Sequence, residues 1–309
     1  MKLKKPRFWD YQKPNFLSNL FYPLSKIYEL ILNLKNTNKK KIKNIKTICV
    51  GNIYIGGTGK TSLSIELKKI LDEKKIKTCF VKKYYSDQID EQKLLKKFGK
   101  TFINKSRLRA LEEAALEKFE VAIFDDGLQD KNINYDLSFV CFNKKNMYGN
   151  GRVIPSGPLR ESLDNLKNYK NVFFNGNKKE ISLVNSLFGN YNNLNYYESF
   201  YQPTNLSNFD LNDSYIAFSG IGNHSTFIEM LSFNKFNIVH DLEFPDHYNY
   251  SNKDIDEIFD LAQKKNAKIL TTEKDYLRLD ENNKKNIKYI QINLRITQLE
   301  EVKRKISFI

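Results

Sequence analysis

A glycine-rich segment between an apolar run and a helical pattern leaves few folds open to this chain. The segment is Gly56-Gly57-Thr58-Gly59-Lys60-Thr61, preceded by the apolar run 47–53 and followed by a helical pattern over 61–74. Strand, glycine loop, Lys-Thr and helix in this order are typical of a phosphate-binding loop, in which backbone N–H groups and the helix N-terminus surround phosphate oxygens. We expect Lys60 to reach the β- and γ-phosphates of a nucleotide and the Thr61 hydroxyl to bind Mg²⁺.

One position departs from the strict pattern G-x-x-x-x-G-K-[ST], because Tyr54 stands where that pattern has its first glycine. The alternative is a glycine turn followed by a chance Lys-Thr pair. The flanking strand and helix patterns favour the phosphate-binding loop over that alternative.

Strand-like and helical patterns alternate along two stretches of the chain. In the first, the strand-like runs are 47–53, 77–82, 121–125, 137–142 and 171–174, and the helical patterns are 61–74, 90–97 and 106–118. A connector rich in Asn, Ser and Tyr follows at 177–213, and a second series alternates from 214 to 306. The alternation predicts an α/β fold with a parallel sheet, helices on both of its faces, and a smaller α/β domain behind it.

Three regions are expected from these patterns. They are an N-terminal basic amphipathic helix region at 1–46, a nucleotide-binding and catalytic domain with the phosphate loop at 47–205, and a smaller C-terminal α/β domain at 206–309. A chain of 309 residues is long enough for two domains. In such folds ligands bind beyond the carboxyl ends of the strands, where the glycine loop falls.

The positive charge of the chain is concentrated at its N-terminus. The whole chain has a net charge of +15, and residues 1–46 hold eleven lysines and one arginine against two acids, a net charge of +10. The helical pattern at 15–34 has one wide apolar face and contains Pro23. A basic amphipathic helix favours an anionic membrane surface, with packing on its own domain and nucleic-acid binding as alternatives.

Other features favour a cytoplasmic protein. There is no run of 18 or more apolar residues and no signal-peptide pattern, so no membrane-spanning helix is expected. Cys49, Cys79 and Cys141 lie in apolar, strand-like runs without metal-ligand spacing. They are interpreted as reduced core residues.

A few acidic residues and one histidine are candidates for handling metal and proton. A strand-like apolar run ends in Asp125-Asp126, a position from which carboxylates hold Mg²⁺ in nucleotide-using enzymes. Asp90 and Glu91 open a helix after the second strand, where acids also simply complement the helix dipole. Among three histidines, His247 lies in a polar loop after a strand and is the best candidate for a proton-handling imidazole.

Separate motifs are spread over nearly the whole chain. They are Phe8-Trp9 with Pro23-Leu24-Ser25-Lys26-Ile27-Tyr28, Val50-Gly51-Asn52 with the glycine loop, Asp125-Asp126-Gly127-Leu128-Gln129, Pro155-Ser156-Gly157-Pro158-Leu159-Arg160-Glu161, Phe218-Ser219-Gly220-Ile221-Gly222, Phe244-Pro245-Asp246-His247 and Thr272-Glu273-Lys274-Asp275. In this order and spacing they resemble the tetraacyldisaccharide 4'-kinase family, the lipid A 4'-kinases of Gram-negative bacteria. The resemblance accounts for Tyr54, because the family has a variant phosphate loop.

The resemblance implies a reaction and its cofactors. The γ-phosphate of ATP would pass to the 4'-hydroxyl of a tetraacylated glucosamine disaccharide 1-phosphate, with Mg²⁺ present, to give the bis-phosphorylated lipid A precursor. The implied catalytic residues are Asp90, His247 and Lys60. Asp90 would take the hydroxyl proton and His247 would orient it or share the proton, and the reverse assignment stays open.

The resemblance also implies which residues bind cofactors. Nucleotide-binding residues would be Gly56, Gly57, Thr58, Gly59, Lys60, Thr61, Arg107, Gln129 and Arg160, and Mg²⁺ and its waters would be served by Thr61, Glu91, Asp125 and Asp126. Three places depart from the family pattern: Asp130 replaces a usual His, Lys82-Lys83-Tyr84-Tyr85 replaces Ser-Arg-Gly-Tyr, and Asn223-His224 replaces Asn-Pro. Lys83 is a candidate substitute for a phosphate-binding arginine, although lysine offers a point charge and not a fork.

The implied partners are a glycolipid substrate and a membrane surface. No nucleic-acid partner is expected, and the chain is expected to be a monomer held peripherally at the cytoplasmic face of the bacterial inner membrane. Two other classes stay open from the residues alone. A P-loop GTPase or metallochaperone would need a guanine-reading loop, which the sequence does not offer, and a nucleic-acid-binding protein would use the basic N-terminus with a steep salt dependence.

Overall fold

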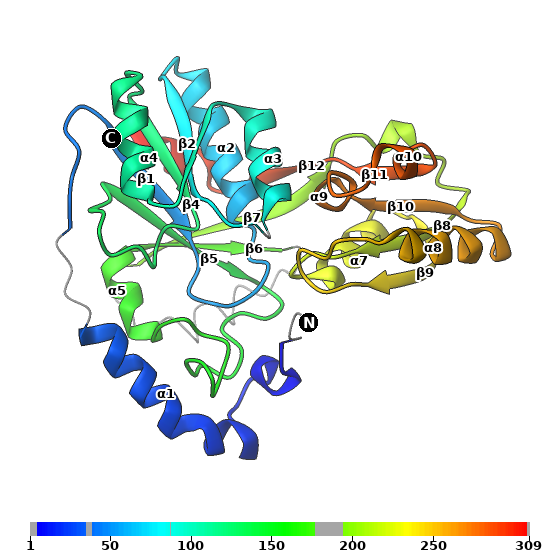
Figure 1. Cartoon of the computed structure of the whole chain (residues 1–309), viewed down its shortest axis with the longest axis horizontal. Helices are drawn as coiled ribbons and strands as arrows, with labels where there is room; N and C mark the ends of the chain where they lie inside the picture. Colours follow the sequence, from blue (N-terminus) through cyan, green and yellow to red (C-terminus); the bar gives the residue numbers. More distant parts are fainter. Residues whose placement is uncertain (1–4, 35–38, 87, 177–193, 308–309) are drawn as a thin grey trace.

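The structure is a computed structural model that describes residues 5–34, 39–86, 88–176 and 194–307, and two sheets form its framework (Figure 1). The larger sheet has eight strands in the order β12-β7-β6-β5-β1-β4-β2-β3. These strands are β1 (Lys46–Gly51), β2 (Thr78–Lys83), β3 (Thr101–Asn104), β4 (Val121–Asp125), β5 (Leu137–Asn143), β6 (Asn171–Asn175), β7 (Asn195–Pro203) and β12 (Ile292–Ile296). Neighbouring strands are parallel except β12 and β7, so the carboxyl ends of β1, β2 and β4 meet at one edge.

Helices cover both faces of the larger sheet. They are α2 (Lys60–Glu73), α3 (Ile89–Phe98), α4 (Arg107–Leu116), α5 (Leu166–Tyr169) and α11 (Leu299–Ser307). Phe173 lies in the core under α2, α3 and α11, whereas Phe174 lies in the core under α4 and α5. The two neighbours part because successive side chains of a strand point to opposite faces. The expected parallel sheet with helices on both faces is confirmed.

The smaller sheet is parallel and has four strands in the order β11-β10-β8-β9. Its elements are β8 (Ser214–Ser219), α7 (His224–Phe233), β9 (Asn237–Glu243), α8 (Asn252–Lys264), β10 (Lys268–Thr272), α9 (Glu273–Tyr276), α10 (Glu281–Lys284) and β11 (Ile287–Ile290). Helices α7 and α8 cover opposite faces, since Met230 and Ile258 lie in separate cores. This is the expected smaller α/β unit.

The end of the chain returns to the larger sheet. Strand β12 pairs antiparallel with β7, and Val302 and Ile306 of α11 lie in the core beneath α2. The expected single strand at 287–292 is instead two strands, β11 in the smaller sheet and β12 in the larger one. The last elements of the expected region 206–309, β12 and α11, therefore pack on the larger sheet. Pairing with β12 covers the backbone groups that β7 would otherwise leave open at the sheet edge. The other domain boundaries stay a prediction.

Two strands were not expected from the sequence. β3 has four residues, which is too short to show a clear periodicity, and β7 falls inside the expected connector at 177–213. The buried residues of β7 are Tyr197, Ser199 and Pro203. Because they are not a run of apolar side chains at every second position, the sequence of β7 shows no clear strand pattern. The part of the connector at 177–193 lies outside the described residues.

The N-terminal helix α1 (Phe16–Leu34) lies at the periphery of the molecule (Figure 1), and Ser18, Ser25 and Tyr28 are on the side that packs against the protein. Ser18 and Ser25 are buried, and their hydroxyls donate to the carbonyl oxygens of Ser156 at 2.8 Å and Val153 at 2.7 Å. The exposed apolar side chains are Phe16, Leu17, Leu20, Leu24, Ile27, Leu30, Ile31 and Leu34. The helix continues through Pro23, and no helix among the described residues has the length and apolarity to cross a bilayer.

Candidate active site

The glycine loop joins the end of β1 to the start of α2. Gly59 precedes α2 with a φ of 86°, a left-handed conformation that favours glycine. A Cβ on Gly59 would lie 2.1 Å from the amide nitrogen of Asn175, and one on Gly57 would lie 3.1 Å from the main chain of Gly222. Position 59 therefore needs glycine, and a side chain at Gly57 would crowd the main chain of Gly222, because the loop lies between the end of β6 and a loop of the smaller sheet.

Tyr54 fills the position where the strict pattern has glycine. Its side chain is buried, and its hydroxyl donates to Asp10 and accepts from Lys5 Nζ at 2.7 Å. The Lys5 ammonium also lies 2.7 Å from Asp10. The missing glycine is thus replaced by a side chain that ties the phosphate loop to the segment preceding α1.

The carboxyl end of β4 places two acids beside the loop. Thr61 Oγ1 donates to Asp125 Oδ2 at 3.2 Å, and Lys60 Nζ lies 3.9 Å from Asp126 Oδ1. Asp125 is completely buried, and its Oδ1 has no hydrogen-bond partner among the described residues. The adjacent acids therefore contact different residues of the loop, Thr61 and Lys60.

Asp126 lies in a left-handed turn, with a φ of 60°, that two arginines support. Arg160 Nη1 donates to Asp126 Oδ1 at 3.1 Å, and Arg107 Nη2 donates to the Asp126 carbonyl. Gln129 accepts from Arg160 at 3.0 Å and donates to the carbonyl of Asn52 at 2.9 Å. Arg107 and Gln129 thus hold the turn and the base of the loop, and contact of either with a nucleotide stays a prediction.

Asp90 and His247 come from elements of different sheets and meet in the structure. Asp90 lies in the first turn of α3, and its Oδ1 is 3.1 Å from Nδ1 of His247 in the loop after β9. Arg278, beyond α9, donates from Nη2 to Asp90 Oδ2 at 2.7 Å and from Nη1 to Asp275 Oδ1 at 2.8 Å. The backbone N–H of His247 donates to Gly220 at 3.0 Å, which fixes the loop.

Lys82 links the acids of the two sides. Its side chain is 1% exposed, and its Nζ donates to Asp125 Oδ2 at 2.7 Å and to Glu91 Oε2 at 2.6 Å. Glu91 Oε1 accepts from Lys274 Nζ at 2.7 Å. Lys83, the expected substitute for a phosphate-binding arginine, lies 5.5 Å above the ring of Tyr85. Of the neighbouring Lys82 and Lys83, it is therefore Lys82 whose side chain contacts the acids of the site.

Neighbouring cations decide the protonation of these groups. Burial opposes ionisation of Asp90, but the hydrogen bond with His247 and the charge of Arg278 hold its pKa well below the usual range. Burial is likewise outweighed for Glu91, whose pKa is lowered by Lys274 and Lys82.

The same balance applies to Asp126 and to Lys82. Burial would raise the pKa of Asp126, and the charges of Lys60 and Arg160 lower it overall. Burial would lower the pKa of Lys82, and the carboxylates of Asp125 and Glu91 raise it well above its usual range. At neutral pH, the carboxylates of Asp90, Glu91 and Asp126 are therefore ionised, and the Lys82 ammonium is protonated.

A magnesium ion fits part of the expected ligand set. Among the described residues there is no group of three or more His, Cys, Asp or Glu side chains that could hold a metal ion. Mg²⁺ that arrives with a nucleotide needs fewer protein ligands, because it keeps waters and takes phosphate oxygens. The Thr61 hydroxyl and the unpartnered Oδ1 of Asp125 fit such an ion. Glu91 and Asp126 are engaged by cations, and their direct coordination stays a prediction.

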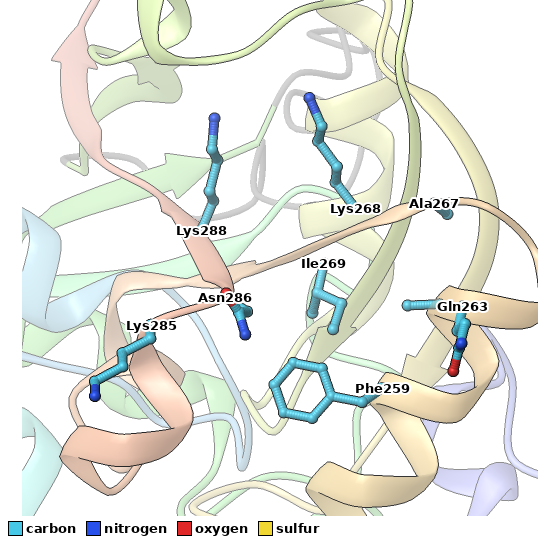
Figure 2. A pocket seen from close by; sticks show the side chains of 9 residues that line it. Phe259, Gln263, Ala267, Lys268, Ile269, Lys285, Asn286 and Lys288 are labelled. Atoms are coloured by element: carbon cyan, nitrogen blue, oxygen red, sulfur yellow. The ribbon is translucent and has the colours of Figure 1, made fainter.

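Sequence reasoning assigned no role to Lys82, Lys274 or Arg278. Their one available signal is position: Lys82 lies near the carboxyl end of β2, and Lys274 and Arg278 follow the carboxyl end of β10. That edge is where ligands bind in parallel sheets. A separate hollow of about 440 Å³ lies beside α8, β10 and β11 and is lined by Phe259, Ile269 and Lys285 among others (Figure 2). None of its lining residues belongs to the candidate site.

A phosphate loop joined through buried charges to a carboxylate–imidazole pair is typical of a P-loop phosphotransferase. The comparisons with known proteins agree with this class. The chain belongs to the tetraacyldisaccharide-1-P 4'-kinase family, whose model matches residues 17–307.

Individual relatives cover the chain almost completely. It is 55% identical over 307 residues to the tetraacyldisaccharide 4'-kinase of Pelagibacter ubique, covering 99% of this chain and 98% of the relative. It is 33% identical to that of Rickettsia canadensis, covering 99% and 97%. A crystal structure of LpxK from Aquifex aeolicus in complex with ATP matches with a TM-score of 0.71 and 25% identity, over 94% of this chain and 99% of the other.

Proposed function

We propose that this chain transfers the γ-phosphate of ATP to the 4'-hydroxyl of tetraacyldisaccharide 1-phosphate and so forms the bis-phosphorylated lipid A precursor. The kinase names of its relatives and the ATP complex of its structural neighbour support this proposal. The observation that carries it is the approach of Asp90 to His247, at 3.1 Å, within the charge network of the phosphate loop. A loop that only hydrolysed or sensed a nucleotide would not need such a pair.

The phosphate loop would hold ATP by geometry and charge. The N–H groups at the start of α2 and the Lys60 ammonium would surround the β- and γ-phosphates, and Arg160 would neutralise charge beside Asp126. Phosphoryl transfer depends mainly on positioning and on stabilising charge, so these contacts are the main contribution of the loop. Mg²⁺, held by Thr61 and Asp125, would supply further neutralisation of the phosphate oxygens when bound.

Asp90 would accept the proton of the 4'-hydroxyl. Its lowered pKa keeps it ionised at physiological pH and ready to accept a hydrogen bond from the acceptor alcohol. His247 would orient Asp90 and share the proton, and Arg278 would fix the other carboxylate oxygen at 2.7 Å. A weak base suffices, because in a loose transition state the attacking oxygen has formed little bond when transfer begins.

The exposed face of α1 would rest on a lipid surface. Eight large apolar side chains face outward, while Ser18 and Ser25 face the protein. In an ordinary amphipathic helix of a soluble protein, the apolar side packs on the core and the polar side faces water. Lys26 and the exposed lysines at 39–41 would add attraction to anionic headgroups. The acyl chains of the substrate stay in the membrane, so we place the chain peripherally at the cytoplasmic face of the inner membrane, as a monomer without a nucleic-acid partner.

Label transfer tests the proposal directly. The full chain is incubated with γ-labelled ATP, Mg²⁺ and tetraacyldisaccharide 1-phosphate in phospholipid vesicles. Label is expected in the lipid, and unlabelled GTP should compete far less than unlabelled ATP. Lys60→Ala should lower incorporation about 100-fold or more, as loss of a charge-stabilising group does. Lys253→Ala, at an exposed lysine of α8, is the matched control. Nucleotide hydrolysis without lipid labelling would overturn the assigned acceptor.

A further inference from the structure

A buried ammonium stands at the middle of the candidate site. Lys82 projects from β2, and its Nζ contacts a carboxylate from β4 at 2.7 Å and a carboxylate from α3 at 2.6 Å. A buried charge is stable only when it is paired, and here both partners are Asp125 and Glu91, acids of the site itself. The ammonium therefore belongs to the centre and not to the surrounding scaffold.

The position of this ammonium is one that a divalent cation would otherwise favour. Carboxylate oxygens brought together from different elements are the ligands that Mg²⁺ and Mn²⁺ prefer. Glu91 has a second cation, Lys274, on its other oxygen at 2.7 Å, whereas Asp125 Oδ1 is buried without a hydrogen-bond partner among the described residues. Oδ2 of Asp125 thus accepts from both Lys82 and Thr61, and Oδ1 is the oxygen left open.

We propose that Lys82 is a built-in cation of the catalytic centre, which occupies the position between Asp125 and Glu91 and limits the centre to the one divalent ion that arrives with ATP. This inference rests on the proposed kinase function. Two-ion phosphoryl-transfer sites bind a second divalent ion near the phosphates. Here the ammonium of Lys82, a residue of β2, would occupy the position of that second ion. Lys82 acts on the reaction by positioning Asp125 and Glu91.

Manganese binding without any nucleotide tests this role. Free Mn²⁺ is counted by electron paramagnetic resonance in titrations of the full chain and of Lys82→Gln, which replaces the ammonium with a neutral amide that can still donate hydrogen bonds. Without nucleotide, we expect Lys82→Gln to bind Mn²⁺ at least about tenfold more tightly than the unaltered chain does. One neighbouring charge changes the affinity of a carboxylate for a proton by about that factor. With a non-hydrolysable ATP analogue, the unaltered chain should bind one Mn²⁺ and Lys82→Gln two.

Two controls separate charge from structure. Lys83→Gln makes the same change in the same strand, at the lysine over Tyr85, and should leave Mn²⁺ binding unaltered. Lys82→Arg keeps the charge and should not create the new site. If Lys82→Gln proves unstable, its melting temperature should rise with Mn²⁺ more than that of Lys83→Gln.

Equal Mn²⁺ binding and equal thermal shifts in Lys82→Gln and Lys83→Gln would overturn the proposal. The titrations contain no lipid acceptor and measure no turnover. Failure of this inference is therefore distinguishable from failure of the kinase assignment, which the label-transfer assay addresses separately.

Discussion

Asp90 owes its ionised state to side chains of the smaller sheet. Arg278 lies 2.7 Å from one of its oxygens and His247 lies 3.1 Å from the other. Burial alone would raise the pKa of Asp90, so the proposed base depends on these partners to stay charged. Arg278 would therefore affect the proposed reaction through Asp90, without touching the substrate.

Replacing Arg278 should therefore change the pH dependence of the reaction. In Arg278→Gln the pKa of Asp90 rises, so the acid limb of kcat/KM should move to higher pH by about one unit or more. Arg304→Gln, at an exposed arginine of α11, should leave the profile unaltered. A lower rate with the same acid limb would mean that Arg278 only supports the fold.

Among the secondary-structure elements, α1 shows how a sequence pattern and its use can differ. The apolar spacing predicts the helix, but periodicity alone does not say which side faces the protein. The answer lies in Ser18 and Ser25, seven residues apart, whose hydroxyls bond to main-chain groups of the loop at 153–156. With these serines inward, most of the large apolar side chains of α1 face outward, whereas Tyr28 packs against the core.

Charges placed on the outward face of α1 should release the chain from lipid. Leu20→Glu with Ile27→Glu removes two apolar side chains, a loss of about 3 kcal/mol and thus about 100-fold in vesicle binding. The free energy of unfolding should hardly change, because both side chains are exposed in the protein. Phe233→Glu, at an exposed phenylalanine of α7, is the matched control in vesicle co-sedimentation. If the α1 variant sediments with vesicles as well as the unaltered chain does, α1 does not form the lipid contact.

The molecule as a whole is joined across its two sheets by ion pairs. Asp90 with Arg278 and Glu91 with Lys274 connect α3 of the larger sheet to the region of α9. The pKa values of both acids are lowered in the folded chain from usual values of 3.8 and 4.5. Their contribution to stability is therefore present above pH 4–5 and is lost as the pH falls below that range through the folded pKa values.

Acid unfolding should expose this contribution. The free energy of unfolding, measured with urea between pH 7 and pH 3, should fall below about pH 4, with about 1 kcal/mol of the loss at pH 3 due to Asp90. In Asp90→Asn that part of the slope should be absent, whereas Asp256→Asn, at an exposed acid of α8, should keep it. The same slope in all three proteins would show that the pairing across the sheets does not stabilise the fold.

Local patterns and motifs predicted most of the fold and only part of the site. The phosphate loop, Asp125 and the two α/β units follow from alternation and spacing, which are local. Return of β12 to the larger sheet could not be predicted, because an apolar run does not reveal which sheet edge it will join. Burial of Lys82 was equally hidden, since neighbouring lysines look alike until the fold brings Asp125 and Glu91 to one of them.

The central claim is that Asp90 and His247 act as one unit, although Asp90 lies in α3 beside the larger sheet and His247 in a loop of the smaller sheet. A double-mutant cycle measures this directly, with kcat/KM for label transfer by the unaltered chain, Asp90→Asn, His247→Gln and the double variant. If the pair works as a unit, the double variant should be about as slow as the slower single variant. Losses that multiply, each single effect appearing in full in the double variant, would contradict the account.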